Sequence, residues 1–398
     1  MKPRIIILIH YMELGGAEMA LIGLLNALSP EKVNVDLFIY SHQGPLMKFI
    51  PKWVNIIPEI KSYSMIERPM IEALRCGSLG VVSRRLMAKY AHHKYVKNTP
   101  ISGDDSSALQ FVADCVTPIL PTINPSVTYD LCISFLTPHN IGRDKVKAHK
   151  RIAWIHTDYS IVNVNAEKEL PVWQAYNHIA SISPDVTRSF LRTFPTLKHK
   201  IIEIENILSP DFVRTRAEEF DASSEVKGPT KLLSIGRYCT AKNYDNLPDI
   251  CRRIIKAGFP DLKWYIIGYG GDEMLIRTKI EESGMQNHVI LLGKRDNPYP
   301  YIKACDIYVQ PSRYEGKSIT VREAQMLCKP VVVTNYPTAK SQVTDGIDGC
   351  IVPLDNQGCA DGIIRFIRDN NLRQQITANL QTRDYGSISE VEKIYQLI

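Results

Sequence analysis

The sequence predicts an α/β protein with two parallel sheets, and three observations carry this prediction. Short apolar runs alternate with amphipathic helical stretches along most of the chain, which is the pattern of repeated strand–helix–strand units. Polar residues and glycines begin where the apolar runs end, as they do at the carboxyl edge of a doubly wound sheet. The length of 398 residues exceeds what one hydrophobic core usually supports. We therefore expect two domains.

The composition is that of an ordinary folded protein, with 44% hydrophobic and 23% charged residues. A formal charge of +6 fits phosphate ligands or an anionic membrane surface better than a dedicated nucleic-acid partner. Nine scattered cysteines without a Cys-x-x-Cys pair predict reduced thiols in a cytoplasmic protein. No apolar run approaches the roughly 20 residues that span a bilayer, and the run after the basic start is too short for a signal peptide. Any contact with the inner face of the plasma membrane is therefore expected to be peripheral.

The chain opens with a strand at 5–9, a turn with Gly15 and Gly16, and a helix at about 17–28, as in a Rossmann-like half. Such a glycine pair is by itself more often structural than ligand-binding. Further strands of the first half are predicted at 33–40, 129–135, 151–156, 179–183 and 201–206. His156 stands at the carboxyl end of its strand and is a ligand-binding candidate, although a lone histidine is structural by default.

Between the second and third strands we expect helices at 69–75 and 79–96, a polar loop from Gly103, and a helix ending at Leu120. The second of these helices combines basic side chains with interleaved apolar ones and no acidic residue: Arg84, Arg85, Lys89, Lys94 and Lys97 with Leu86, Met87, Tyr90, Tyr95 and Val96. This pattern suits a helix that lies on an anionic membrane, and equally a packed helix with a solvated basic face. Both interpretations stay open.

A polar break divides the chain before the second series of strands. It is rich in Glu, Asp, Ser and Lys and ends in Gly228-Pro229. The predicted organisation is an N-terminal domain at 1–210, a linker at 211–228, a C-terminal domain at 229–385, and a final helix within 386–398 that could pack back across the junction. Strands of the second domain are predicted at 231–235, 262–267 and 289–292 and on both sides of a helix in the stretch 306–334.

The stretch 306–334 carries the most chemistry. It reads as a strand, a loop with Glu315 and Gly316, a helix with Glu323 in its first turns, and a second apolar strand. The loop ends in Gly316-Lys317-Ser318, so a helix N-terminus and a lysine can receive an anion such as phosphate. Carboxylates beside a phosphate site accept hydrogen bonds from sugar hydroxyls. A sugar-phosphate ligand is therefore predicted here.

Six motifs in the second half form a recognisable series. They are Gly236-Arg237 with Lys242, Gly268-x-Gly270, Ala304-x-Asp306 followed by Pro311-Ser312, Glu315-Gly316, Glu323, and Asp345-Gly-x-x-Gly349. In this order and spacing they resemble the retaining glycosyltransferases of family 4, which have the GT-B fold. The resemblance covers most of the C-terminal half, and Gly15-Gly16 and His156 add to it in the N-terminal half. It implies two Rossmann-like domains that face each other across a cleft.

The resemblance also implies roles for single residues. Arg237 and Lys242 would neutralise the diphosphate of a nucleotide-sugar, Glu315 would bind the donor sugar, and His156 would reach the sugar near its anomeric carbon. Glu323 would accept hydrogen bonds from the ribose. The wider donor-binding set comprises Gly15, Gly16, Gly268, Gly270, Lys294, Arg295, Ser312, Gly316, Lys317, Ser318 and Glu323. The sequence has no Asp-x-Asp for a divalent metal, so a metal-independent reaction without a cofactor is expected.

Two loops depart from the family pattern. The family usually has an aromatic residue and Gly or Pro after Glu-Gly, where this chain has Lys317-Ser318, and Gly-Gly before Glu where this chain runs from Asn335 to Gln342. Both loops would contact the donor sugar or acceptor, so the identity of the sugar stays open. Lys317 could contact an acidic acceptor such as a lipid-linked diphosphate.

These observations favour an enzyme, a retaining hexosyltransferase that moves a sugar, most plausibly from a UDP-sugar, to a lipid-linked or growing surface glycan. Capsule, exopolysaccharide and lipopolysaccharide assembly are the expected settings. The alternatives are a sugar-nucleotide epimerase or phosphorylase of the same fold, and a non-catalytic partner that binds a sugar nucleotide. Neither glycine turn extends to Gly-x-Gly-x-x-Gly with an acidic residue about 20 positions on, which argues against a nicotinamide enzyme.

Overall fold

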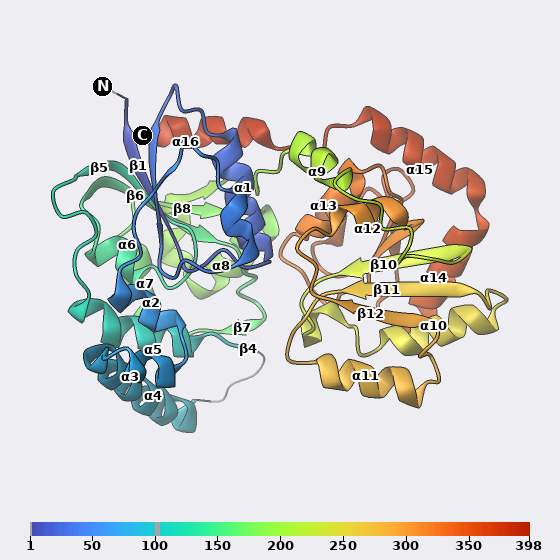
Figure 1. Ribbon diagram of the computed structural model, residues 1–398, viewed down its shortest axis with the longest axis horizontal. Coiled ribbons are helices and arrows are strands. Elements are labelled where there is room, and N and C mark those ends of the chain that lie inside the picture. Colours follow the sequence, from blue (N-terminus) through green and yellow to red (C-terminus); the bar gives the residue numbers. More distant parts are fainter. Residues whose placement is uncertain (1, 100–103) are drawn as a thin grey trace. The chain divides into compact units, whose positions relative to one another are not determined.

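The computed structural model describes residues 2–99 and 104–398, and the chain forms two compact units. The first contains the chain up to Ile207 together with Ser387–Ile398, and the second is Leu208–Gly386. Each unit is built on its own parallel sheet with helices around it (Figure 1). The predicted α/β class with two parallel sheets is confirmed.

The sheet of the first unit has seven strands within the described residues, in the order β3-β2-β1-β5-β6-β8-β9. The strands are β1 (Arg4–Ile9), β2 (Asn34–Ile39), β3 (Asn55–Ile56), β5 (Tyr129–Ser134), β6 (Ala148–Ile155), β8 (His178–Ser181) and β9 (Ile201–Glu203). All neighbours pair in parallel. β1 lies inside the sheet between β2 and β5, and its side chains are apolar and almost completely buried. The predicted strand at 201–206 ends earlier, at Glu203.

The helices of the first unit follow the strands in sequence. They are α1 (Gly16–Ala27), α2 (Lys61–Glu67), α3 (Met70–Arg75), α4 (Leu79–Asn98), α5 (Ser107–Val116), α6 (Asn140–Asp144), α7 (Ala166–Gln174) and α8 (Pro184–Thr193). Gly103 of the predicted polar loop lies outside the described residues. Asp104–Asp105 form β4, which pairs in parallel with β7 (Val162–Asn163).

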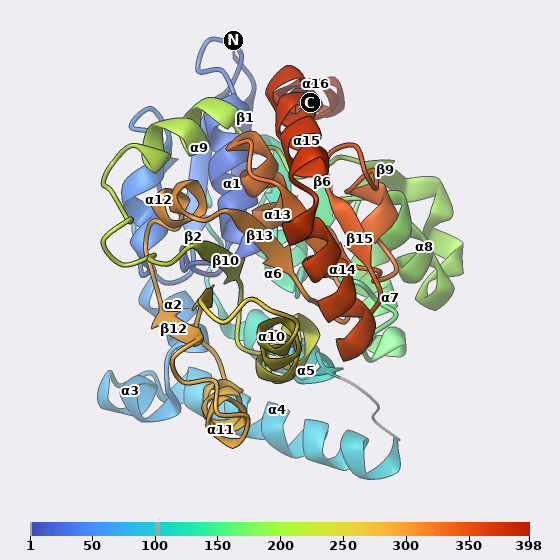
Figure 2. The ribbon, with the colours of Figure 1, turned by 90° about the vertical axis from the view of Figure 1, so that its right-hand side faces the viewer.

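Helix α4 is longer than the other helices around it and packs beside α3 and α5 (Figures 1 and 2). Its buried side chains are Val81, Val82 and Ala88, and the two valines belong to the core of the first unit. Arg85 donates hydrogen bonds to the carbonyl oxygens of Met65 at 2.8 Å and Arg68 at 2.7 Å. Within the predicted basic surface, Arg85 therefore holds α4 to the chain around α2.

The second unit has six parallel strands within the described residues, in the order β12-β11-β10-β13-β14-β15. The strands are β10 (Thr230–Ile235), β11 (Leu262–Ile267), β12 (Val289–Gly293), β13 (Ile307–Gln310), β14 (Val331–Thr334) and β15 (Cys350–Val352). The helices are α9 (Pro210–Ala217), α10 (Leu247–Lys256), α11 (Glu273–Glu282), α12 (Tyr299–Ala304), α13 (Ile319–Met326), α14 (Asn356–Arg368) and α15 (Asn370–Thr382). Helices α10 and α14 pack on one face of this sheet and bury Ile250, Ile254 and Ile363 against it. Strands β10 and β13 are neighbours, so the loops that follow them meet at one edge.

The second unit begins at Leu208 and ends at Gly386, whereas the C-terminal domain was predicted at 229–385. Residues 211–228, predicted as a linker, belong to this unit and begin within α9, which packs on α12 and α13. The final helix α16 (Val391–Leu397) belongs to the first unit. There the Ser29 amide donates to the Tyr395 hydroxyl at 2.7 Å, and Lys393 Nζ donates to the Glu203 carbonyl at 2.9 Å.

All nine cysteines are free thiols in the described residues, and five of them are buried. Burial raises the pKa of Cys132, Cys251 and Cys305 to about 12, so these thiols stay protonated at neutral pH. The prediction of unpaired, mostly buried thiols is confirmed. Within the described residues, no helix has the length and apolarity needed to cross a bilayer.

Candidate functional site

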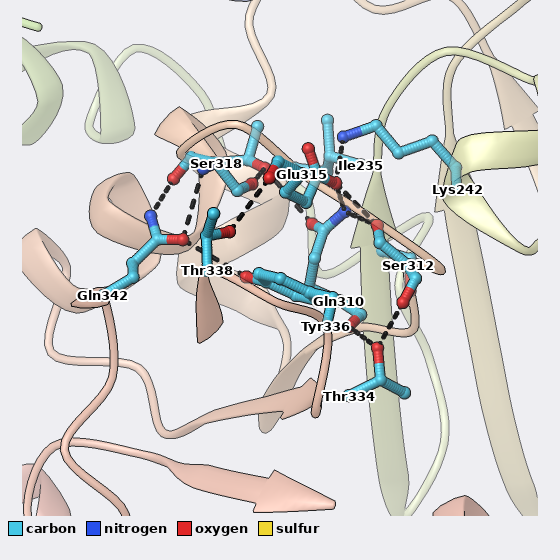
Figure 3. Close-up of polar contacts among 12 residues, drawn as sticks. Ile235, Lys242, Gln310, Ser312, Glu315, Ser318, Thr334, Tyr336, Thr338 and Gln342 are labelled. Atoms are coloured by element: carbon cyan, nitrogen blue, oxygen red, sulfur yellow. Dashed lines mark hydrogen bonds and ion pairs between the residues drawn. The ribbon is translucent and has the colours of Figure 1, made fainter. Parts of the chain in front are cut away.

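The carboxylate of Glu315 is the centre of a polar cluster at the carboxyl edge of the second sheet (Figure 3). Its Oε1 accepts hydrogen bonds from Lys242 Nζ at 2.6 Å, Ser312 Oγ at 2.6 Å and Gln310 Nε2 at 2.9 Å. The side chains of Lys242 and Glu315 are only 17% and 11% exposed. The ion pair is therefore largely removed from water, and two neutral donors support it.

Two neighbouring strands bring these residues together. Gln310 is the last residue of β13, and Lys242 ends the short helical turn Thr240–Lys242 that follows β10. Asn243 then adopts a left-handed conformation with φ of 61°, and its amide donates to the Pro311 carbonyl at 2.9 Å. The loops after β10 and β13 are thus joined directly beside the ion pair.

The orientation of the Gln310 amide is set by a buried tyrosine. The Tyr308 hydroxyl donates to Gln310 Oε1 at 2.6 Å, which leaves the amide nitrogen facing Ser312 and Glu315. Gln310 and Ser312 are both completely buried. This arrangement keeps three donors aimed at one carboxylate oxygen without rearrangement.

The two loops that depart from the family pattern are hydrogen-bonded to each other. The Ser318 amide donates to Gln342 Oε1 at 3.2 Å, and Gln342 Nε2 donates to the Ser318 carbonyl. Thr338 Oγ1 donates to the Glu315 carbonyl at 2.9 Å (Figure 3). The Ser318 amide, which the sequence offers to an anion, is therefore used by Gln342 in this structure.

Glu323 lies on α13 and is 3% exposed. Its Oε1 accepts a hydrogen bond from the Tyr299 hydroxyl at 2.7 Å. Burial raises the pKa of the Glu323 carboxyl to about 7, and the bond from Tyr299 opposes that shift. The carboxyl can therefore change protonation near neutral pH, unlike an ordinary surface glutamate.

Gly268 and Gly270 are needed for the close approach of two loops. A Cβ atom on Gly268 would meet the Gly236 carbonyl oxygen at 1.9 Å, and one on Gly270 would meet the Tyr238 carbonyl oxygen at 2.4 Å. The close packing of these two loops therefore explains why both positions are glycines. Arg237 lies in the first of these loops, between Gly236 and Tyr238. Its side chain is exposed and makes no hydrogen bond or ion pair with the residues that the structure describes. Its guanidinium is open to an anionic ligand.

Lys294 and Arg295, two residues of the predicted donor-binding set, follow β12. Lys294 Nζ lies 5.0 Å from the centre of the Tyr269 ring. Arg295 donates to Glu225 at 2.8 Å and to the Tyr301 hydroxyl at 2.8 Å. Arg295 is consequently held by its own unit, so its backbone is better placed than its side chain to contact a ligand.

The remaining predicted residues belong to the first unit. Gly15 immediately precedes α1, and a Cβ atom there would lie 2.2 Å from Glu18 Oε2. His156 follows β6, with its ring centre 4.6 Å from that of Phe135. Burial lowers the pKa of His156 to about 3, so its imidazole is neutral at physiological pH. Its Nε2 has no hydrogen-bond partner within the described part of the chain.

Sequence reasoning missed four residues that shape the site: Gln310, Tyr299, Thr338 and Gln342. Gln310 carried a usable signal, since it is a polar residue at the carboxyl end of an otherwise apolar strand. Gln342 and Thr338 lie in the loop whose departure from the family was recognised, but their bonds to Ser318 and Glu315 depend on tertiary contacts.

Solved structures share this fold over nearly the whole chain. A crystal structure of Anabaena Alr3699/HepE in complex with UDP and glucose matches with a TM-score of 0.67, at 16% identity, over 98% of both chains. A structure of S. aureus TarM in complex with Fondaparinux, alpha-GlcNAc-glycerol and UDP matches with a TM-score of 0.70, at 12% identity, over 99% of both chains. The class is therefore the GT-B fold that the resemblance implies.

A family model matches the second half. Residues 215–383 match the model of the family described as Glycosyl transferases group 1. Poly(glycerol-phosphate) alpha-glucosyltransferase of Bacillus subtilis is 30% identical over 149 residues, which are 37% of this chain and 22% of that protein.

Two further relatives match to a similar extent. N-acetylgalactosamine-N,N'-diacetylbacillosaminyl-diphospho-undecaprenol 4-alpha-N-acetylgalactosaminyltransferase of Campylobacter jejuni is 31% identical over 156 residues, 38% of this chain and 41% of that protein. UDP-Gal:alpha-D-GlcNAc-diphosphoundecaprenol alpha-1,3-galactosyltransferase of Escherichia coli is 26% identical over 170 residues, 41% and 43% of the two chains. The chain spans less than half the length of each of these three relatives.

The ion pair generates a first prediction. Lys242→Ala should weaken UDP binding about 10- to 100-fold, because a charge-assisted hydrogen bond is worth roughly 1.5–3 kcal/mol. Glu315→Gln should preserve or strengthen UDP binding, because it removes a negative charge beside Lys242. Isothermal titration calorimetry measures both, with Lys256→Ala at the exposed end of α10 as the control. Equal UDP affinity in Lys242→Ala and Lys256→Ala would contradict a diphosphate role for Lys242.

Glu323 generates a second prediction. If ribose hydroxyls donate to its carboxylate, ligand binding lowers its pKa from about 7, and a proton is released. UDP affinity should therefore rise between pH 6 and pH 8 and level off above. Tyr299→Phe should move the midpoint to higher pH, because the tyrosine bond lowers the pKa. Glu323→Gln should abolish the dependence, and a profile unchanged by this substitution would exclude the ribose contact. Calorimetry in buffers of different ionisation enthalpy counts the protons.

Proposed function

We propose that this protein is a retaining, metal-independent glycosyltransferase that moves a sugar from a UDP-sugar to a hydroxyl of a lipid-linked or growing surface glycan. The observation that carries the proposal is the cluster of Lys242, Glu315, Gln310 and Ser312 within a group 1 glycosyl transferase domain. It sets a cation and a hydroxyl-binding carboxylate side by side at the ligand-binding edge of a parallel sheet.

The proposed roles follow from charge and exposure. Arg237, which is exposed, and Lys242 would stabilise the charge that develops on the departing diphosphate, in place of a metal ion. Glu315 would accept hydrogen bonds from donor-sugar hydroxyls while it keeps Lys242 in position. Glu323 would bind the ribose. His156, neutral because of burial, would supply a hydrogen bond to the donor sugar without adding charge.

Retention of configuration requires that the acceptor attack from the face that the diphosphate leaves, or that a nucleophile of the protein intervene. The residues proposed above include no nucleophile assigned to the opposite face. We therefore favour same-face attack: the acceptor oxygen bonds to the anomeric carbon, the bond to the diphosphate oxygen breaks, and that oxygen takes the acceptor proton. The positive charges of Arg237 and Lys242 make the diphosphate a better leaving group.

The relatives support the choice of donor and acceptor. The Escherichia coli relative is named for a UDP-Gal donor and a diphosphoundecaprenol-linked acceptor, and the Campylobacter jejuni relative for a diphospho-undecaprenol acceptor. Both solved structures described above are complexes that contain UDP. Lys317, on the loop that follows Glu315, would suit the diphosphate of such an acceptor.

We further propose that α4 contacts an anionic membrane at the inner face of the plasma membrane. Leu86, Met87 and Tyr90 are 52%, 54% and 74% exposed, and Lys89 between them is also exposed. A purely solvated basic face does not explain three large apolar side chains turned outward. Apolar side chains among lysines suit the boundary between headgroups and acyl chains.

A third prediction tests the enzyme. The purified protein, incubated with UDP-sugars, should release UDP slowly in the absence of an acceptor and faster with a lipid-linked glycan. Arg237→Ala and Glu315→Gln should each reduce the transfer rate at least 100-fold, because each removes a group that contacts the donor in the transition state. EDTA should change the rate less than twofold. If the protein neither binds nor cleaves any UDP-sugar, the proposal is wrong. Formation of a glycosylated product would exclude a protein that only binds sugar nucleotides. A product with retained α configuration would exclude an epimerase.

A fourth prediction tests the membrane contact. The protein should float with vesicles that contain phosphatidylglycerol and not with vesicles of phosphatidylcholine alone, and 0.5 M salt should release it. Reversal of charge at Lys89, Lys94 and Lys97 should reduce binding by tenfold or more, since each lysine near an anionic surface contributes about 1 kcal/mol. The control reverses three exposed lysines elsewhere in the same unit, Lys52, Lys61 and Lys198. Equal loss in both variants would refute a specific role for α4.

A further inference from the structure

The first unit contains a small cavity near the carboxyl ends of β5 and β6, with both polar and apolar residues in its lining. Its volume is about 30 Å³, and its lining includes His139, Glu169 and Trp173, which are buried. Leu109 and Thr157 also line it and are exposed, so the cavity reaches the surface beside them. Ligands of parallel α/β sheets bind at this edge.

Two hydrogen-bond donors hold the Glu169 carboxylate beside the cavity, and both donate to the same carboxylate oxygen. Tyr159 OH donates to Glu169 Oε2 at 3.2 Å, and Trp173 Nε1 donates to the same atom at 3.3 Å. Burial raises the pKa of the Glu169 carboxyl to about 7. A buried carboxyl without a salt bridge is costly unless something uses its remaining hydrogen-bonding capacity.

His139 provides an independent indication of a binding site. The residue is 2% exposed, and its Nδ1 lies 2.8 Å from Ser134 Oγ on β5. Its Nε2, on the other edge of the ring, is buried and has no hydrogen-bond partner in the described part of the chain. Burial lowers the pKa of His139 to about 3, so the ring is neutral, with one nitrogen donating and the other accepting.

The walls of the cavity are fixed by contacts outside it. Gln110, also part of the lining, donates its amide to Asp114 at 2.7 Å and to Asn140 at 3.1 Å. Lys168 forms an ion pair with Asp114 at 2.8 Å. This network anchors α5 to α6 and α7, the helices that frame the cavity, and so fixes the positions of the lining residues.

Size and chemistry together restrict the occupant. A cavity needs roughly 10–15 Å³ to hold one water, so this one admits a group of hydroxymethyl size but no sugar ring. The occupant must suit a carboxyl and a neutral imidazole whose tautomer is open. A hydroxyl group can donate and accept at once, and it therefore satisfies either tautomer.

We propose that this cavity binds the primary-alcohol arm of the acceptor, with Glu169 and His139 as its hydrogen-bond partners and the indole edge of Trp173 beside it. The proposal rests on the proposed function, since it concerns the acceptor side of the same transferase. It makes Glu169 a specificity residue that distinguishes a hydroxymethyl group from a methyl group. An alcohol arm of a hexose and that of a glycerol unit share this chemistry.

The indole N–H of Trp173 reports directly on the cavity. The chain has four tryptophans, so the ¹⁵N-labelled protein gives a small set of indole signals, and Trp173→Phe assigns the one of interest. We expect methyl glucoside, galactoside or mannoside, or glycerol, to shift this signal in a saturable manner. The matching 6-deoxy glycosides should bind at least tenfold more weakly. Trp264, whose indole donates to Ser234 at 2.9 Å in the core of the second unit, is the internal control.

Three results decide the matter. Saturable shifts that require the primary alcohol, and that Glu169→Gln weakens at least tenfold, support the proposal. Equal shifts for the hydroxymethyl and 6-deoxy ligands overturn it, and so does the absence of any shift, which would mean that the cavity holds only a structural water. UDP-sugar hydrolysis without acceptor, measured on the same samples, reports separately on the proposed function. A folded Glu169→Gln protein is recognised by an unchanged Trp264 signal.

Discussion

The buried ion pair between Lys242 and Glu315 is the interaction on which the candidate site depends. Removal of two charges from water costs free energy that their attraction alone does not always recover. Here Ser312 and Gln310 donate two further hydrogen bonds to the same carboxylate oxygen. The result is a cation held at the carboxyl edge of the sheet in a fixed orientation, before any ligand binds. Such preorganisation is what a reaction that develops charge on a diphosphate requires.

The loops around this pair behave as one connected structure. The Thr338 hydroxyl donates a hydrogen bond to the backbone carbonyl of Glu315. The side-chain amide of Gln342 accepts a hydrogen bond from the backbone N–H of Ser318 and donates one to the Ser318 carbonyl. Both loops depart from the pattern of the family that the chain resembles. Because they are bonded to each other, a change in one alters the position of the other. Under the proposed function, the choice of donor sugar would depend on both loops together.

The two units share a physical feature although their residues differ. In each, buried polar groups with incomplete pairing or shifted pKa values gather near the carboxyl ends of strands or on the helices that follow them. Glu323 is the example in the second unit, and Glu169, His139 and His156 are the examples in the first. Groups of this kind are expensive to keep in a protein interior, so their concentration at ligand-binding edges supports functional assignments there.

The local pattern of apolar and polar residues in the sequence predicted much of the fold. Apolar runs such as Ile5–Ile9 predict buried parallel strands because side chains on both faces must be apolar, and the structure confirms them. The placement of Glu315 and Lys242 near one sheet edge also followed from the strand that precedes each. Strand ends were less predictable, as the short β9 shows. The prediction for Arg85 was incomplete, because its bonds to the carbonyls of Met65 and Arg68 depend on how α4 packs.

The sequence by itself determined the class of protein, since periodicity and the spacing of glycines, cations and carboxylates are properties of the chain in order. Only the tertiary structure decided which of those groups are paired. Lys242 and Glu315 stand 73 residues apart and meet because β10 and β13 are neighbours in the sheet. Tyr299 on α12 reaches Glu323 on α13, and Gln342 after β14 reaches Ser318 before α13, through other tertiary contacts of the same unit. Burial and pairing set the pKa of each group and the strength of its interactions. Neither burial nor pairing can be read from the order of residues in the chain.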